Sequence, residues 1–287
     1  MRFFVKHIIA FTAAAMLCCS CSNKDNHTDK PVIFVSIAPL KAIAEAITGD
    51  DFDVRILVPA GASPESFEPS MRQFVALNQA QLVLSTGLID FEKNLVSKIS
   101  DHSKVADLSR GIDLIAGECS HHHHGHTHAH GVDPHIWSSP VALKIMARNA
   151  YEAIRAQYPD SIKYQNAYIR LCERTDTLDN SVNEICANAT HRYFIIYHPA
   201  LTYLARDYGL EQISIEHEGK EPGAKRIAEI IERARRDGIT RIFYQAQFPK
   251  SVVETIAGDI GAEAVEIDPL AEDLFGNLEY ITRLITE

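Results

Sequence analysis

The sequence has no apolar run of transmembrane length at its start, and it lacks an H-E-x-x-H or any other hydrolytic motif. Residues 8–17 form a short apolar run that follows Arg2 and Lys6, a pattern typical of an export signal. No coiled-coil heptads appear. The sequence therefore predicts an exported chain and contains no hydrolytic motif.

Basic residues are fewer than acidic ones, with 28 Lys and Arg against 38 Asp and Glu. Removing residues 1–20 with the signal takes away Arg2 and Lys6 and no acid, so 26 basic residues face 38 acidic ones and the net charge becomes −12. Such a surface does not favour nucleic acid or anionic headgroups. We expect no nucleic-acid partner and membrane contact only through a lipid anchor.

Cysteines near the start point to such an anchor. The apolar run ends in a cysteine-rich stretch that is similar to a bacterial lipoprotein signal, and the small Ser20 makes Cys21 the expected lipidated residue. Cys18 stands where the usual lipobox has Leu, and a cleaved soluble signal is the alternative. We assign residues 1–21 to the signal and lipidated cysteine and residues 22–31 to a polar tether.

Short apolar strands alternate with amphipathic helices in two series. Strands are expected at 32–37, 52–58, 82–85 and 105–108, and again at 193–197, 212–215, 241–244 and 264–267. Helices are expected at 39–47, 70–80, 91–99 and 139–157, and again at 200–208, 225–236, 251–260 and 277–285. The alternation predicts an α/β fold of two lobes, each a mostly parallel sheet flanked by helices. We place the N-terminal lobe at 32–159 and the C-terminal lobe at 190–287.

The longest helical pattern, at 160–189, separates the two series and contains neither Gly nor Pro. A helix of this length, roughly 43 Å, more plausibly links two lobes than lies inside one. Cys172 and Cys186 within it would be about 21 Å apart, too far for a disulfide. Cys119 is expected to be a free thiol or a soft metal ligand.

Histidine is concentrated in one stretch, since eight of the fourteen lie between Glu118 and Trp137. Seven of them have no apolar face nearby: His121, His122, His123, His124, His126, His128 and His130. We expect a mobile loop at 118–131 that collects metal ions weakly, with a merely solvated loop as the alternative. His135 is different, because Ile136 and Trp137 could fix it in a core as a ligand of a formed site. Taken alone, it would more often be a core histidine.

Three more polar residues each follow a predicted strand: Glu65, His198 and Asp268. Ligands of parallel sheets bind beyond the carboxyl ends of the strands, so two facing lobes would bring these residues and His135 to one cleft. Two nitrogens and two oxygens suit a divalent first-row ion. Singly, each residue could instead cap a helix, start a turn or be solvated. His217 is the expected substitute if Glu65 does not bind.

The order of motifs resembles the solute-binding proteins of zinc and manganese ABC importers, the ZnuA/TroA or cluster A-I type. The resemblance covers about residues 31–287. It rests on P-x-G-x-x-P-E-x-F-E-P at 59–69, the His-rich insert, DPHIW at 133–137, YHPALTYLARDYGL at 197–210, EPGAKR at 221–226 and IDPL at 267–270. It implies two α/β lobes joined by one long rigid helix, with one metal ion buried between them.

On this resemblance the family's second and third histidines fall on His135 and His198, and its C-terminal aspartate falls on Asp268. The first histidine falls on Glu65, a departure that replaces imidazole by carboxylate, which can still bind zinc. Gln245 is a second departure, at a position where zinc-binding relatives often carry Glu.

The resemblance implies a monomeric, extracytoplasmic receptor lipoprotein, on the periplasmic or cell-surface side, that captures Zn²⁺ without catalysis and delivers it to an ABC-importer permease. The His-rich insert favours zinc; manganese or iron is the alternative, because oxygen-rich sites suit Mn²⁺. A zinc-dependent hydrolase with three protein ligands and a bound water is a rival interpretation. A lipoprotein adhesin or zinc reservoir without a permease is another.

Deleting residues 120–130 tests the collecting role of the loop. We expect calorimetric zinc titration of the deletion variant to keep one tight site and to lose several weak ones, because the loop would act through local concentration of ions. An unchanged stoichiometry would rule out that role.

Overall fold

The computed structural model describes residues 30–117, 131–216 and 222–287. Several expected features lie outside these ranges: Cys21, most of the tether, Cys119, the seven loop histidines and His217. Residues 31–287 pack as one compact unit. None of the helices in the described ranges has the length and apolar composition that crossing a bilayer requires.

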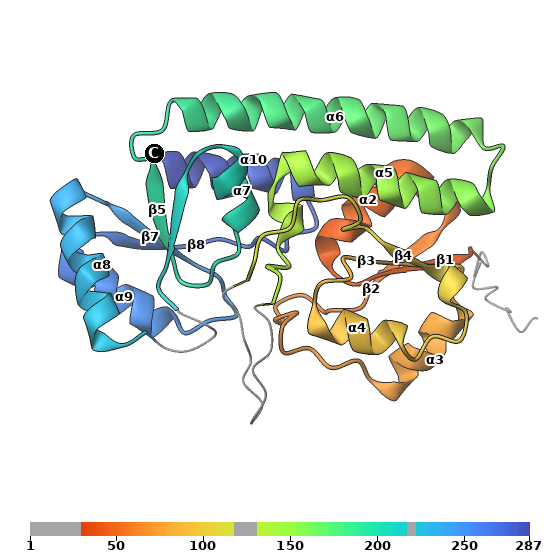
Figure 1. Ribbon diagram of the computed structural model, residues 1–287, viewed down its shortest axis with the longest axis horizontal. Coiled ribbons are helices and arrows are strands. Elements are labelled where there is room, and N and C mark those ends of the chain that lie inside the picture. Colours follow the sequence, from red (N-terminus) through yellow and green to blue (C-terminus); the bar gives the residue numbers. More distant parts are fainter. Residues whose placement is uncertain (1–29, 118–130, 217–221) are drawn as a thin grey trace, which may run out of the picture. The chain divides into compact units, whose positions relative to one another are not determined.

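Two four-stranded sheets form the framework (Figure 1). The first has the order β2-β1-β3-β4 and contains β1 (Val32–Val35), β2 (Asp53–Ile56), β3 (Leu82–Ser85) and β4 (Val105–Asp107). The second has the order β6-β5-β7-β8 and contains β5 (Tyr193–Ile196), β6 (Glu211–Ser214), β7 (Arg241–Tyr244) and β8 (Glu263–Glu266). All pairings between these strands are parallel, which confirms the predicted α/β class.

Helices connect the strands where the sequence predicts them. The first series is α2 (Ala38–Thr48), α3 (Met71–Gln79), α4 (Asp90–Val96) and α5 (Pro140–Gln157), and the second is α7 (Thr202–Asp207), α8 (Ala224–Asp237), α9 (Lys250–Ile260) and α10 (Leu274–Thr286). Helix α5 is capped at its start, because the Ser139 hydroxyl accepts a hydrogen bond from the Val141 amide and Pro140 occupies the first turn. Three short 3-10 helices were not separated from loops in the sequence: η1 (Gly49–Asp51), η2 (His102–Lys104) and η3 (Ile136–Ser138).

Strand β5 shows how apolar side chains hold the two sheets in one unit. Phe194 and Ile196 belong to the large core cluster that also contains the residues of the first sheet. Tyr193 and Ile195, which point to the other face, join a second cluster with residues of α8 and α9. One face of the second sheet therefore shares its core with the first lobe, and the other face has a core of its own.

Helix α6 (Ile162–Ala187) is the long helix expected at 160–189. It packs against α2 and α5, which flank the first sheet, and against α10, which follows the second (Figure 1). Its buried stripe includes Leu171, Leu178 and Val182. This confirms a two-lobe fold tied by one long helix, while the lobe boundaries given above stay predictions. Cys172 and Cys186 are both free.

A cluster of polar side chains joins α5, α6 and the end of α7. The Lys144 ammonium lies 2.8 Å from Oδ2 of Asp179, and the Tyr208 hydroxyl donates to Oδ1 of the same carboxylate at 2.7 Å. Burial raises the pKa of Asp179, but the hydrogen bonds from Lys144 and Tyr208 outweigh it and hold the pKa below its usual value. The carboxylate thus links both lobes to the long helix.

We expect Asp179→Asn to destabilise the protein in a pH-dependent way. A lowered folded pKa contributes stability above the unfolded pKa and loses it as pH falls through the folded value. Urea denaturation should show a cost of about 1 kcal/mol near pH 7 that shrinks toward zero near pH 3. The exposed Asp160→Asn is the control, and an equal cost of Asp179→Asn at both pH values would contradict the ion-pair role.

Candidate metal centre

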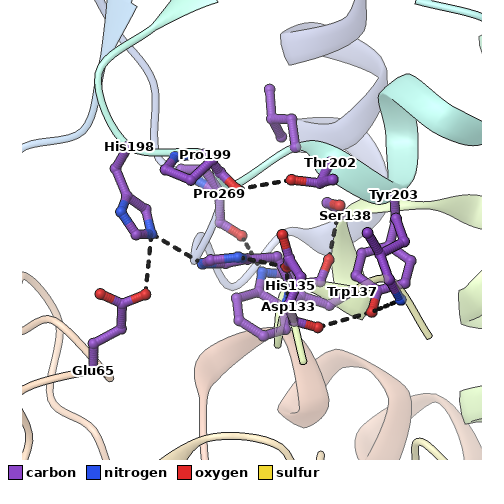
Figure 2. A network of polar contacts seen from close by, with 12 residues as sticks. Glu65, Asp133, His135, Trp137, Ser138, His198, Pro199, Thr202, Tyr203 and Pro269 are labelled. Atoms are coloured by element: carbon purple, nitrogen blue, oxygen red, sulfur yellow. Dashed lines mark hydrogen bonds and ion pairs between the residues drawn. The ribbon is translucent and has the colours of Figure 1, made fainter. Parts of the chain in front are cut away.

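Three of the predicted ligands meet in the described part of the chain. Glu65, His135 and His198 each offer one donor atom, and these atoms lie within 4.8 Å of one another (Figure 2). Nε2 of His198 is 3.2 Å from Oε1 of Glu65 and 3.2 Å from Nε2 of His135. Metal bonds of 2.0–2.1 Å in a tetrahedral zinc site place neighbouring donors about 3.3–3.4 Å apart. The two separations of 3.2 Å are therefore close to the edge of such a tetrahedron.

The two imidazole rings face each other through Nε2 because their other nitrogens have partners. Nδ1 of His135 is 2.9 Å from Oδ1 of Asp133, and Nδ1 of His198 is 2.8 Å from Oε1 of Glu216. A carboxylate accepts hydrogen bonds, so the proton of each neutral ring lies on Nδ1 and the lone pair lies on Nε2. Two lone pairs at 3.2 Å repel each other unless a cation lies between them. The arrangement suits a bound cation.

Charge in the site is predominantly negative. Burial lowers the pKa of His198, but the hydrogen bonds and charges of Glu216 and Glu65 outweigh it and raise the pKa to about 9. Burial raises the pKa of the Asp133 carboxyl, but His135 outweighs it and the pKa is held below its usual value. The imidazole of His198 is thus stabilised in its cationic form by the surrounding carboxylates, which would stabilise a metal ion in the same way.

Glu65 stands in the loop after β2, and α4 supports this loop. The Phe67 ring packs edge-on against Phe91 with ring centroids 5.1 Å apart. Glu92 fixes the start of α4, because its fully buried carboxylate accepts four hydrogen bonds. They come from the amides of Thr86, Leu88 and Ile89 and from the Thr86 hydroxyl, at 2.6–3.1 Å. The position of Glu65 therefore depends on a buried, hydrogen-bonded side chain outside the site.

His135 is held by the short sequence around it. Asp133 accepts from both the backbone amide and the ring of His135, at 2.9 Å each. Trp137, 2% exposed, donates from Nε1 to the Pro269 carbonyl of the other lobe at 3.0 Å (Figure 2). The D-P-H-I-W motif thus positions one predicted ligand and joins the two lobes beside it.

The residues just before and just after the segment that carries the loop histidines lie next to each other. Ala116 and Val132 form an antiparallel bridge, and the Gly117 amide donates to the Gly131 carbonyl. The Asp133 amide donates to the Ile115 carbonyl at 2.9 Å. These contacts fix the backbone that leads directly into Asp133 and the predicted ligand His135.

His198 is held from two more sides. It lies two residues beyond β5, where Gln245 donates from Nε2 to its carbonyl at 3.0 Å. The Phe248 ring stacks on the imidazole with centroids 4.6 Å apart and planes 14° apart. Oε1 of Gln245 is buried and has no hydrogen-bond partner among the residues that the structure describes. Exchanging the amide oxygen and nitrogen of Gln245 would place two acceptors, its oxygen and the His198 carbonyl, against each other. Oε1 is therefore the amide atom left as an orphan acceptor beside the predicted site.

The space beside the three donors is small and mostly apolar. A cavity of about 40 Å³ is lined by Pro64, Ile89, Trp137, Phe248 and Leu270 together with the ligands. Glu65 is the one carboxylate among the described residues that line it. Room for one ion and little else fits a metal site better than a site for an organic molecule.

Asp268, predicted as the fourth ligand, is not among the three converging residues. Its side chain is exposed, and Oδ1 accepts from the Leu270 amide at 2.9 Å. Its carbonyl accepts from the Ala271 amide at 3.2 Å and from the Asn277 side chain at 2.8 Å. The alternative that the sequence left open, a turn begun by Asp-Pro, is the one present, and it holds the carboxylate away from the imidazoles.

Two functional carboxylates were missed as partners of the ligands. Asp133 had a local signal, because an Asp two residues before a histidine can reach its amide and its ring. Glu216 had none in the sequence alone, because it meets His198 only through the pairing of β5 with β6.

The model of one protein family matches residues 33–286, and its description is "Zinc-uptake complex component A periplasmic", or ZnuA. The chain belongs to this family. The predicted resemblance is thereby confirmed.

Individual members of the ZnuA family agree with this. The zinc-binding lipoprotein AdcA of Streptococcus pneumoniae is 26% identical over 277 residues, which cover 92% of this chain and 54% of AdcA, so the chain spans about half the length of that relative. The high-affinity zinc uptake system protein ZnuA of Bacillus subtilis is 28% identical over 283 residues, covering 92% and 88%. A crystal structure of a ZnuA deletion mutant with zinc bound superposes with a TM-score of 0.81 at 32% identity, covering 90% of this chain and 97% of that one.

Tyr203, which is fully buried, connects the lobes next to Asp133. Removing its hydroxyl should weaken the contact between the lobes, which we call the seam. Its hydroxyl accepts from the Ile115 amide at 3.2 Å and donates to the Asp133 carbonyl at 2.8 Å. Tyr203→Phe leaves both backbone groups without this partner, so we expect urea denaturation to show a loss of about 1–3 kcal/mol. Tyr280→Phe, at a residue 58% exposed, should change stability by less than about 0.5 kcal/mol. Equal effects of the two substitutions would contradict the role of the hydroxyl.

Proposed function

We propose that this chain captures one Zn²⁺ with Glu65, His135 and His198 and delivers it to the permease of an ABC-type importer. The observation that carries the proposal is the convergence of three donor atoms within 4.8 Å of one another, with Nε2 of His198 3.2 Å from each of the other two, beside a small, mostly apolar cavity. Membership of the ZnuA family and the zinc-binding names of the relatives support it.

Zinc is the proposed ion because two of the three donors are imidazoles. Affinity for nitrogen and oxygen donors rises from Mn²⁺ to Zn²⁺, so zinc should win a direct competition at this site. The carboxylate of Glu65 is the observation that favours manganese or iron as the alternative, since harder oxygen donors suit those ions better than a third imidazole does.

A tetrahedral ion held by three protein donors takes a fourth from elsewhere. Asp268 remains the protein candidate, and to bind it would leave the turn in which its carboxylate now accepts from Leu270. A water molecule on the ion is the other candidate, because it could donate to the orphan oxygen of Gln245. Zinc affinity of Asp268→Asn separates them: a loss of tenfold or more assigns the aspartate, and an unchanged value assigns the water.

Binding without catalysis fits the carboxylates of the site. Three ligands and a water are also the pattern of a catalytic zinc, which would need a general base nearby. Glu65 is the one carboxylate among the described residues lining the cavity, and as a ligand it is not available as a base. Asp133 and Glu216 are engaged with Nδ1 of the two rings. We therefore propose a receptor rather than a hydrolase.

The proposed receptor is a monomer, exported and anchored outside the cytoplasmic membrane through a lipid on Cys21. Support comes from the signal-like start of the sequence and from the lipoprotein name of AdcA. A tether of about ten residues would let the metal-binding unit reach a permease in the same membrane.

Zinc titration of metal-stripped protein, purified without a His tag, tests the proposal. We expect one tight site in addition to weak binding by the loop, and a melting temperature that rises with zinc because the ion binds only the folded state. His135→Ala and His198→Ala should each lower the tight affinity more than about 100-fold, beyond the 10–100-fold cost typical of outer partners.

The exposed His102→Ala is the matched control and should bind zinc like the parent chain. Tight zinc binding that survives loss of both His135 and His198 would refute the site. Tight manganese binding in the presence of equimolar zinc would refute the choice of metal. Zinc-dependent turnover of a hydrolase substrate, lost in the double variant, would favour the enzyme.

A further inference from the structure

Glu216 reaches His198 through the register of two neighbouring strands. Strands β5 and β6 are parallel, and Ile196 pairs with Ser214 at their carboxyl ends. His198 and Glu216 each lie two residues farther along, and the Glu216 amide still donates to the Tyr197 carbonyl at 3.1 Å. Because side chains two residues apart point to the same face, the imidazole and the carboxylate project side by side.

The contact is short and shielded from water. Oε1 of Glu216 lies 2.8 Å from Nδ1 of His198, and the two side chains are 6% and 4% exposed. The opposite ring nitrogen, Nε2, faces Glu65 and His135. Glu216 therefore cannot bind the same ion as Nε2, and its carboxylate acts on the far edge of the ring.

We propose that Glu216 is a positioning residue that sets the metal affinity of His198. It keeps the ring proton on Nδ1, so that Nε2 presents its lone pair to the ion, and its negative charge makes the imidazole a stronger donor. This inference rests on the proposed metal-capturing function, and it adds a residue outside the ligand set on which that function depends.

Ring placement and proton placement are separable here. The Phe248 ring stacks on His198, and Gln245 holds its backbone carbonyl. Glu216→Gln keeps an oxygen acceptor for Nδ1 and removes the charge, whereas Glu216→Ala removes both. The two variants therefore measure the charge and the hydrogen bond, while the ring stays held by its other neighbours.

The test compares these variants in the full chain without its export signal. Zinc affinity is measured near neutral pH by competition with a chromophoric chelator, and the melting temperature is measured in the metal-free state. We expect about a tenfold loss for Glu216→Gln and up to about a hundredfold loss for Glu216→Ala. Glu263→Gln, an exposed carboxylate at the start of β8, should bind zinc like the parent chain.

A spectroscopic readout separates this role from a merely structural one. In ¹⁵N-resolved histidine NMR spectra of the zinc-loaded parent chain, the Nδ1 proton of His198 should be protected and shifted downfield by its carboxylate partner. That signal should move in Glu216→Gln and exchange with solvent in Glu216→Ala. A structural role alone would lower the melting temperature of the metal-free protein and leave the affinity of the folded fraction unchanged.

Zinc affinity within about twofold of the parent chain in both folded variants, against the 10–100-fold expected of such a partner, would overturn this inference and leave the proposed function intact. If Glu216→Ala does not fold, the conservative Glu216→Gln still decides the question. Absence of tight zinc binding by the parent chain would overturn the proposed function, and the role of Glu216 would fall with it.

Discussion

Two imidazole nitrogens face each other 3.2 Å apart, and a carboxylate lies behind each ring against Nδ1. This pair is unfavourable when both rings are neutral and no cation lies between them, and it becomes favourable when a shared positive charge does. Burial strengthens both effects, because His135 and His198 are 6% and 3% exposed and the local dielectric is low. The chemistry of the site follows from this one opposition of lone pairs.

The separation of the two nitrogens depends on how firmly the lobes are joined. His135 belongs to the first lobe and His198 to the second, so any sliding of one lobe would change the distance directly. Hydrogen bonds from Trp137 to Pro269 and from Tyr203 to Asp133 cross the seam close to the rings. Helix α6, packed against helices of both lobes, constrains the same relation from farther away. These contacts constrain the separation of the two nitrogens through the protein itself, which limits the reorganisation that ion binding requires.

Much of the fold could be predicted because it depends on local patterns. The β-branched runs of β1 and β5, the Pro140 start of α5 and the uninterrupted α6 are all visible in the chain. Glu65, His135 and His198 could be proposed together because ligands gather at the carboxyl ends of parallel strands. Asp268 also follows a strand, but its carboxylate turns away and accepts from the Leu270 amide. The composition of the segment does not decide whether this carboxylate takes part in a local turn or binds an ion.

Glu216 marks the other limit of sequence reasoning. Its contact with His198 spans 18 residues and depends on which strand lies beside β5 and in which register, a tertiary property. Glu92 is a second example. Its hydrogen bonds to Thr86 and Ile89 are local, but its support of the Glu65 loop depends on the tertiary contact between Phe91 and Phe67. Residues that act through another side chain leave the weakest trace in a single sequence.

The bridge between Ala116 and Val132 has a consequence for engineering. Because the chain enters and leaves the intervening segment at adjacent backbone positions, a different peptide could replace that segment with little added strain on either end. The exit lies one residue before Asp133, so a grafted peptide carrying an environment-sensitive dye would be attached three residues before His135. The fold thus offers an attachment point from which a fluorescent sensor of site occupancy could be built.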